Sequence, residues 1–396
     1  MTKSTFRSLL FLVLLSIFSF SCTQEETGND QLTVLNITDK DLKAFDEVIS
    51  EIEFIPLLIP EDKPISLLPF DPYLYVDNKI YFSNGDFRDA SIHVFELDGT
   101  YEKSLNQQGE GPEEYRSISG LDISGNELMV WDGSGALSHY NTEDFSFIKK
   151  TELVKGRFIP DYKMIGEGKW LLVFDIGEDV DELGYHNGFH IWDEKKDVLE
   201  VLNIKIPPLA TEMVEGQFAK IDSESYLLNF GTSDTLYRYT KGGIEPVMAF
   251  NFNNNNLPEK EKLNPEDAIE NALLNQLYSF NMGGIVVADG TVRIPVFGIK
   301  KSANMDPENM GTFPINYVFI DYPGSRVKAI RAFGSFSAKG FARDEYFYEL
   351  LYSEEVMGHI EAGNFGKYSP LLEEAVEKLI DKEDPVIMKY KVRFEK

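Results

Sequence analysis

The sequence predicts an all-β protein built from repeated strand units, and three observations lead to this prediction. The chain has 396 residues, of which 43% are apolar and 13% aromatic, so it is able to bury a large core. Segments 91–97 and 100–105 flank Asp98 and Gly99, a strong signal for a β-hairpin. The same order of strand, polar turn and return strand recurs along the chain. A single β-unit has therefore been repeated.

The spacing of the repeats predicts the architecture. Equivalent positions before the polar turn are occupied by Phe95, Tyr140, Trp192, Tyr239 and Ile320, which lie 45, 52, 47 and 81 residues apart. The first three steps match a propeller blade, which takes about 40–50 residues. The predicted strands are 78–82, 91–97 and 100–105; 127–131, 136–140 and 145–150; 169–174, 189–192 and 198–204; 226–230, 235–239 and 246–252; and 284–287, 291–297, 317–321 and 327–333.

Two lone strands, 52–58 and 386–393, complete the expected fold. The first has no upstream partner and the second has no downstream partner, so pairing them makes a sixth blade and closes the ring. We therefore predict a six-bladed β-propeller. Apolar residues at helical spacing also predict helical insertions near 258–278 and 341–381, the latter with helices over 343–357 and 370–380.

The N-terminus has the layout of an export signal. Lys3 and Arg7 precede an apolar run, 9–20, that is too short to span a bilayer, so residues 1–21 are predicted to be a signal peptide. Cys22 is the only cysteine and cannot form an internal disulfide. Its position after Ser21 resembles the bacterial lipoprotein signal, which implies a lipidated first residue and a membrane anchor. Ser19 stands where that signal usually has Leu, and it also suits ordinary secretion.

Residues 22–31 are polar and read as a tether, and segment 32–37 could form a short strand where the propeller domain, 32–396, begins. The acidic residues after Cys22 resemble the signal that sends some lipoproteins to the outer face of the outer membrane. The formal charge of the chain is −28, so it repels a nucleic-acid backbone and favours a neutral or cationic ligand. We expect no nucleic-acid partner.

The segment 109–115 allows two interpretations. It contains Gly109, Gly111, Pro112, Glu114 and Tyr115. Glycines expose backbone N–H groups and the glutamates are acceptors, so the segment could form a ligand loop. Alternatively, Tyr115 fills the space between two blades while the glycines permit the turn. We favour this second interpretation, an inter-blade loop, because stacked blades must fill the space at each join.

Other candidate sites carry weaker signals. His186 and His190 would suit a metal if they lay on one helix, but the glycines beside them disfavour a helix. His93 and His139 lie on predicted strands, where a hydrogen-bonded structural role is expected. The acidic segment 178–182 offers oxygen ligands for calcium but lacks the spacing of a known calcium loop, which favours a solvated loop. We therefore assign no catalytic residue, no metal ligand and no cofactor, with calcium as the remaining alternative.

Three segments, 109–115, 233–238 and 384–387, resemble parts of the NHL-like and TolB-like six-bladed β-propellers found as lipoproteins in Gram-negative bacteria. The resemblance covers residues 50–396 and implies a cell-envelope protein at the outer membrane, facing the periplasm or the cell surface. Such propellers commonly bind a ligand or a protein partner at the loop face or in the channel. The alternative is a calcium-dependent hydrolase, similar to the lactonases and esterases that gather Glu, Asn and Asp at the channel of the same fold.

Overall fold

The computed structural model describes the folded part of the chain. Contacts divide the chain into Met1–Thr33 and Val34–Lys396, and the second unit carries the fold. The described residues are 32–63, 65, 73–84, 89–132, 135–154, 159, 161–166, 168–174, 188–202, 204, 216–262, 276–300, 314–332, 340–352, 357–358, 360–361 and 363–394.

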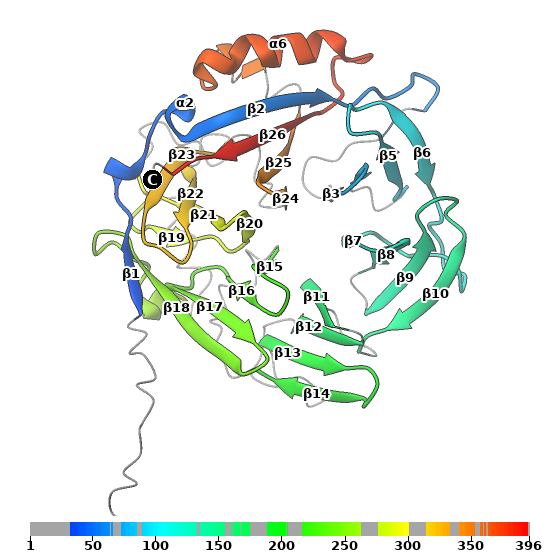
Figure 1. Cartoon of the computed structure of the whole chain (residues 1–396), viewed down its shortest axis with the longest axis horizontal. Helices are drawn as coiled ribbons and strands as arrows, with labels where there is room; N and C mark the ends of the chain where they lie inside the picture. Colours follow the sequence, from blue (N-terminus) through cyan, green and yellow to red (C-terminus); the bar gives the residue numbers. More distant parts are fainter. Residues whose placement is uncertain are drawn as a thin grey trace, which may run out of the picture. The chain divides into compact units, whose positions relative to one another are not determined.

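Six small antiparallel sheets stand around a common centre, which confirms the predicted six-bladed β-propeller (Figure 1). In chain order, blade 1 holds β3 (Leu74–Val76), β4 (Ile80–Ser83), β5 (Ile92–Phe95) and β6 (Tyr101–Leu105); blade 2 holds β7 (Gly120–Ser124), β8 (Glu127–Trp131), β9 (Ala136–Asn141) and β10 (Phe147–Glu152). Blade 3 holds β11 (Asp161–Gly166), β12 (Lys169–Phe174), β13 (Gly188–Asp193) and β14 (Val198–Val201); blade 4 holds β15 (Phe218–Lys220), β16 (Tyr226–Leu228), β17 (Thr235–Thr240) and β18 (Gly243–Asn251). Blade 5 holds β19 (Phe280–Asn281), β20 (Val286–Ala288), β21 (Thr291–Phe297), β22 (Ile315–Asp321) and β23 (Val327–Arg331); blade 6 holds β24 (Phe341–Arg343), β25 (Tyr346–Leu351), β26 (Val386–Val392) and β2 (Ile49–Pro56).

The core is divided among the six junctions between neighbouring blades. One hydrophobic cluster fills each junction, because both faces of a blade pack against other blades. Strand β12 shows the resulting pattern: Trp170 and Leu172 point into the junction with blade 2, whereas Leu171 and Val173 point into the junction with blade 4. This two-sided burial explains why β12 is apolar without interruption from Trp170 to Phe174.

The ring closes as predicted, by pairing of the two ends of the domain. Strand β2 is antiparallel to β26, with Phe54 opposite Met388, and β26 pairs on its other side with β25. The chain before β2 also covers the outer edges of two further blades. Strand β1 (Thr33–Asn36), predicted as a short strand, joins β18 of blade 4, and Leu42 bridges to Ala329 in β23 of blade 5. This N-terminal belt covers edges that would otherwise be open to aggregation.

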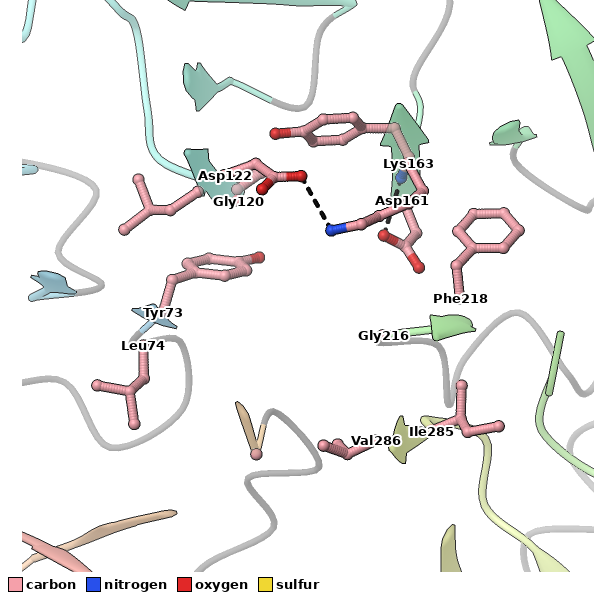
Figure 2. Close-up of a pocket in the computed structure, with 14 residues that line it drawn as sticks. Tyr73, Leu74, Gly120, Asp122, Asp161, Lys163, Gly216, Phe218, Ile285 and Val286 are labelled. Atoms are coloured by element: carbon pink, nitrogen blue, oxygen red, sulfur yellow. Dashed lines mark hydrogen bonds and ion pairs between the residues drawn. The ribbon is translucent and has the colours of Figure 1, made fainter. Parts of the chain in front are cut away.

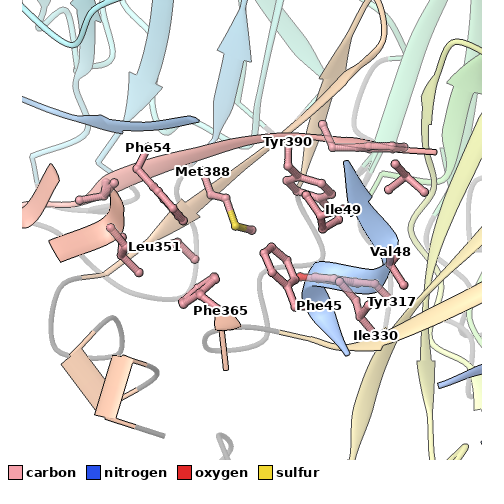
Figure 3. Close-up of a cluster of buried hydrophobic side chains, with 14 of the residues drawn as sticks. Phe45, Val48, Ile49, Phe54, Tyr317, Ile330, Leu351, Phe365, Met388 and Tyr390 are labelled. Atoms are coloured by element: carbon pink, nitrogen blue, oxygen red, sulfur yellow. The ribbon is translucent and has the colours of Figure 1, made fainter. Parts of the chain in front are cut away.

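The helices with defined bounds among the described residues are short: η1 (Asp39–Asp41), α2 (Phe45–Val48), α3 (Glu259–Lys262), η5 (Gly366–Tyr368) and α6 (Ser369–Lys378). Residues 357–358 and 360–361 are also helical. Helix α6 confirms the prediction over 370–380 and lies along the outside of β2 (Figure 1). Phe45 of α2 packs on Phe365 with ring centroids 5.3 Å apart, in the cluster that also holds Met388 (Figure 3). Within the ranges that the structure describes, no helix is long and apolar enough to cross a membrane.

The helix predicted over 343–357 is wrong for its first part. Residues up to Leu351 form β24 and β25, the two inner strands of blade 6. The apolar spacing resembled a helix because both faces of β25 are packed, and the buried Glu349 interrupts its apolar run. For the insertion predicted over 258–278, the structure describes α3 and residues 276–278, and residues 263–275 lie outside the described ranges.

Candidate central pocket

A pocket of about 160 Å³ lies where the innermost strands of all six blades begin. Its lining comes from the start of β3, β7, β11, β15, β20 and β24, which surround the centre of the ring (Figure 1). Because neighbouring strands are antiparallel, this end of the ring also receives the connections from each outer strand to the next inner strand. The connection 106–119, for example, is longer than the turns at the opposite end, such as 77–79 and 125–126. The pocket therefore lies at the loop-rich end.

One wall of the pocket is charged. The Lys163 ammonium on β11 donates to Asp122 Oδ2 on β7 at 2.9 Å, and this ion pair crosses the junction of blades 2 and 3 (Figure 2). Burial opposes the charge of Lys163, but the attraction of Asp122 and the hydrogen bond to it outweigh this, so the pKa of Lys163 is raised. The lysine is therefore a permanent cation.

Asp161 adds a second carboxylate at the start of β11. Its Oδ2 accepts a hydrogen bond from the backbone N–H of Gln217 at 2.6 Å, and its Oδ1 accepts from the N–H of Tyr162 at 2.8 Å. The first of these bonds joins blade 3 to blade 4. Two carboxylates and one ammonium thus line the pocket, a formal charge of −1 for its lining side chains. In the ranges covered by the structure, no three His, Cys, Asp or Glu residues are grouped to hold a metal.

The opposite wall is apolar. Ile285 and Val286 lie across the pocket from Lys163, and Leu74 and Phe218 lie on the flanks (Figure 2).

Tyr162 of β11 also contributes to the lining. Its hydroxyl is buried without a hydrogen-bond partner among the described residues, and burial raises its pKa. The pocket therefore offers hydrogen-bonding groups on one side and apolar surface on the other.

The inter-blade loop is not part of the pocket lining. The N–H of Gly111 donates to Glu114 Oε2 at 2.7 Å, and a Cβ on Gly109 would collide with the same oxygen. Tyr115 is fully buried at the junction of blades 1 and 2, where its hydroxyl donates to Ala90 O at 2.8 Å. Pro112, in the same loop, is exposed. The polar groups of this loop therefore form hydrogen bonds with one another and within the blade junction.

The three histidines that the structure describes are also absent from the pocket lining. His93 lies 2.9 Å from the Ser91 hydroxyl, and burial lowers its pKa to about 4. His139 contacts Glu127 Oε2 at 3.0 Å through Nδ1 and the Thr151 hydroxyl at 3.1 Å through Nε2. His190 Nδ1 lies 2.9 Å from Gly188 O. Cys22, His186 and the acidic segment 178–182 lie outside the described residues.

Sequence reasoning missed the residues of the charged wall. Asp161 and Lys163 flank Tyr162 on a strand that was not predicted, and Asp122 is a single acidic residue within an apolar strand. The one usable signal was the alternation of charged and apolar residues on a strand that begins a blade. Nothing local connects Asp122 with Lys163, because they lie in different blades.

Solved structures resemble this chain to different degrees. A protein from Bacteroides fragilis NCTC 9343 that bears the name "putative exported protein" aligns with a TM-score of 0.64 over 92% of this chain and 100% of its own, at 15% identity. The N-terminal domain of Nup159 aligns with a TM-score of 0.40 over 81% of this chain and 77% of its own, at 11% identity. An uncharacterized protein from Listeria monocytogenes EGD-e reaches 0.33 over 68% of this chain and 70% of its own, at 9% identity. The first of these likenesses supports the propeller architecture.

Sequence comparison shows the family. No curated protein matches the chain. A family model, the Domain of unknown function (DUF4934), matches residues 32–391, which is nearly the whole propeller. The chain therefore belongs to the DUF4934 family.

Proposed function

We propose that this protein is an exported, lipid-anchored propeller of the cell envelope that binds a ligand in its central pocket. One observation carries the proposal: the inner strands of all six blades converge on a pocket with one charged wall and one apolar wall. Such an arrangement orients a ligand by a few polar groups while it removes apolar surface from water. The overall charge of −28 favours a neutral or cationic ligand over an anionic one.

Support for the cellular location comes from the chain and from a relative. The structural relative from Bacteroides fragilis bears the name "putative exported protein", and the first residues of this chain have the layout of a secretory signal. Cys22 follows that signal directly, as in the lipoproteins of the NHL-like and TolB-like type. The proposed address is the outer membrane, facing the periplasm or the cell surface.

The anchor is tested by Cys22→Ala. We expect the variant to leave the membrane fraction, because Cys22 is the only thiol that a lipid could modify. Ser21→Ala serves as a matched control and keeps the cysteine. Membrane retention of Cys22→Ala equal to that of the control would contradict lipid anchoring.

Ligand binding is tested by thermal shift with glycans, peptides and divalent cations. A ligand that binds only the folded state stabilises it by about 2.7 kcal/mol at a concentration 100 times its Kd. The matched variant is Gly216→Asn, since Gly216 lines the pocket, has a φ of +64° that asparagine tolerates, and leaves open space where a Cβ would stand. A thermal shift of equal size in this variant would place the ligand elsewhere and refute the central pocket.

One result would replace binding by catalysis. Calcium-dependent turnover of an ester or lactone, abolished by Asp122→Asn and Asp161→Asn, would assign the protein to the hydrolases of this fold. The two carboxylates do converge on the channel, as such a hydrolase requires, but one is paired with Lys163 and the other receives two backbone N–H groups. We therefore propose binding as the function.

A further inference from the structure

We propose that the central pocket recognises a neutral, polyhydroxylated ring, namely a single sugar unit such as the end of a glycan. This inference rests on the proposed function, that the pocket binds a ligand, and names its chemical class. It follows from two features of the lining: charges that already neutralise one another on one wall, and apolar surface on the opposite wall.

The charged wall disfavours a charged ligand of either sign. An anion that approached Lys163 would also face the carboxylates of Asp122 and Asp161, within a chain whose formal charge is −28. A cation that approached these carboxylates would face the Lys163 ammonium, which is already paired with Asp122 at 2.9 Å. Either ion would have to break this pair or lie beside a like charge.

A hydroxyl group avoids both penalties. It donates to a carboxylate oxygen and accepts from an ammonium, so neighbouring hydroxyls can bridge Asp122 and Lys163 without separating the ion pair. Hydrogen bonds to charged groups are stronger than those between neutral groups, so these contacts can compete with hydrogen bonds to water. Two adjacent hydroxyls on one ring therefore match the alternating charges of this wall.

The remaining wall fits the C–H face of the same ring. Ile285 and Val286 offer apolar surface on this wall, and Phe218 on the flank adds an aromatic ring (Figure 2). The cavity of about 160 Å³ is smaller than the roughly 300–1,000 Å³ of pockets that hold drug-sized ligands. It accommodates one ring, so any longer glycan would extend from the pocket toward the loop-rich end.

The tryptophans provide a built-in reporter for this site. The three tryptophans of the chain, Trp131, Trp170 and Trp192, all belong to the cluster at the junction of blades 2 and 3. Tyr162, which lines the pocket, belongs to the same cluster and lies 5.0 Å from Trp131 between ring centroids. Intrinsic fluorescence of the full chain should therefore respond when the pocket is filled.

The experiment titrates the full chain with glucose, galactose, mannose, xylose and N-acetylglucosamine, and with ethylammonium and acetate as small charged probes. We expect a saturable fluorescence change with at least one sugar and none with either ion. Lys163→Met should raise the Kd for that sugar by about tenfold or more, because it removes a charged hydrogen-bond donor. Lys378→Met is the matched control, since Lys378 pairs with Glu374 at 2.8 Å on the exposed side of α6.

The outcomes distinguish failure of the sugar inference from failure of the proposed function. If no sugar gives a saturable response, or if an ion does so and Lys163→Met weakens it, the sugar inference is overturned while a binding pocket remains. If a sugar binds and its Kd is unchanged in both Lys163→Met and Gly216→Asn, the pocket is not the site and the proposed function falls as well. Gly216→Asn protects the test against a folding defect of Lys163→Met, because it leaves the ion pair intact.

Discussion

A buried ionic triad joins blades 5 and 6 and allows a prediction with a defined sign. Arg293 of β21 and the Tyr390 hydroxyl of β26 both donate to Glu349 Oε1 of β25. Arg293 is 1% exposed and Glu349 is 5% exposed, so neither charge has access to bulk water. Burial opposes the charge of Arg293, but Glu349 and Tyr390 outweigh it, and the pKa of Arg293 is raised. Arg293 is therefore charged at any working pH.

The experiment compares the unfolding free energy of a single variant, Arg293→Met, with that of a triple variant that replaces all three residues. Arg293→Met leaves the Glu349 carboxylate buried without a cation, and we expect this to cost about 3–5 kcal/mol of unfolding free energy. The triple variant Arg293→Met, Glu349→Leu, Tyr390→Phe leaves no buried charge and no unpaired hydroxyl in the triad. Its expected stability lies near that of the wild type or above it by about 1–4 kcal/mol. The triple change should therefore be less harmful than the single change.

Urea unfolding followed by far-UV circular dichroism and tryptophan fluorescence measures both variants. Arg238→Met is the control, because Arg238 pairs with Glu245 at the surface, where loss of an ion pair costs about 0–1 kcal/mol. A triple variant that is less stable than Arg293→Met would refute the reasoning, since it would mean that the charges themselves stabilise the junction. Coupling among the three residues is expected because they share one acceptor.

Three further predictions concern the junctions and the belt. Tyr115→Phe should cost about 1–3 kcal/mol in urea unfolding, because it removes the buried hydroxyl that bonds Ala90 O; an unchanged midpoint would contradict this role. Burial lowers the pKa of His93 from 6.5 to about 4, so the unfolded chain binds this proton more tightly and stability should fall by up to about 3 kcal/mol as the pH drops from 6.5 to 4. His93→Gln should flatten that part of the stability curve, and an identical curve would reject the assignment. Leu35→Ala, in the buried face of β1, should cost about 2–5 kcal/mol, whereas Val34→Ala on its exposed face should stay within about 0.5 kcal/mol; equal effects would show that the belt is not packed.

The fold could be predicted from the sequence because its information is local. Each hairpin is marked by a polar turn, such as Asp98-Gly99, and the repeat spacing reports the blade length. Ring closure followed from two strands without neighbours, and the pairing of Phe54 with Met388 confirms it. The prediction for β25 failed for a physical reason. A strand that is buried on both faces shows no alternation of apolar and polar residues, so the spacing of its apolar residues does not distinguish it from a helix.

The pocket could not be predicted in the same way, because its lining is assembled across the whole chain. Leu74 and Gly340 meet at the same cavity although they stand at opposite ends of the propeller sequence. The contact of Asp122 with Lys163 depends on how two blades are rotated about the ring, which no local pattern encodes. Charged residues on inner strands are nevertheless a usable signal, because middle strands such as β12 are buried by packing and outer strands such as β14 face solvent.

The polar contacts between blades link the lining of the central pocket to the blade junctions. Each of the six junctions combines its hydrophobic cluster with a polar contact between neighbouring blades. Going round the ring, these are Tyr75 to Ile123 O at 3.3 Å, Lys163 to Asp122 at 2.9 Å, Gln217 N to Asp161 at 2.6 Å, Asn229 to Gly284 O at 2.7 Å, Arg293 to Glu349, and Arg343 to Asp77 at 3.1 Å. The contacts made by Lys163 and Asp161 are the ones among these whose side chains line the pocket. The groups proposed to recognise a ligand therefore also hold blades 2, 3 and 4 together, so a bound ligand should stabilise these junctions as it fills the pocket.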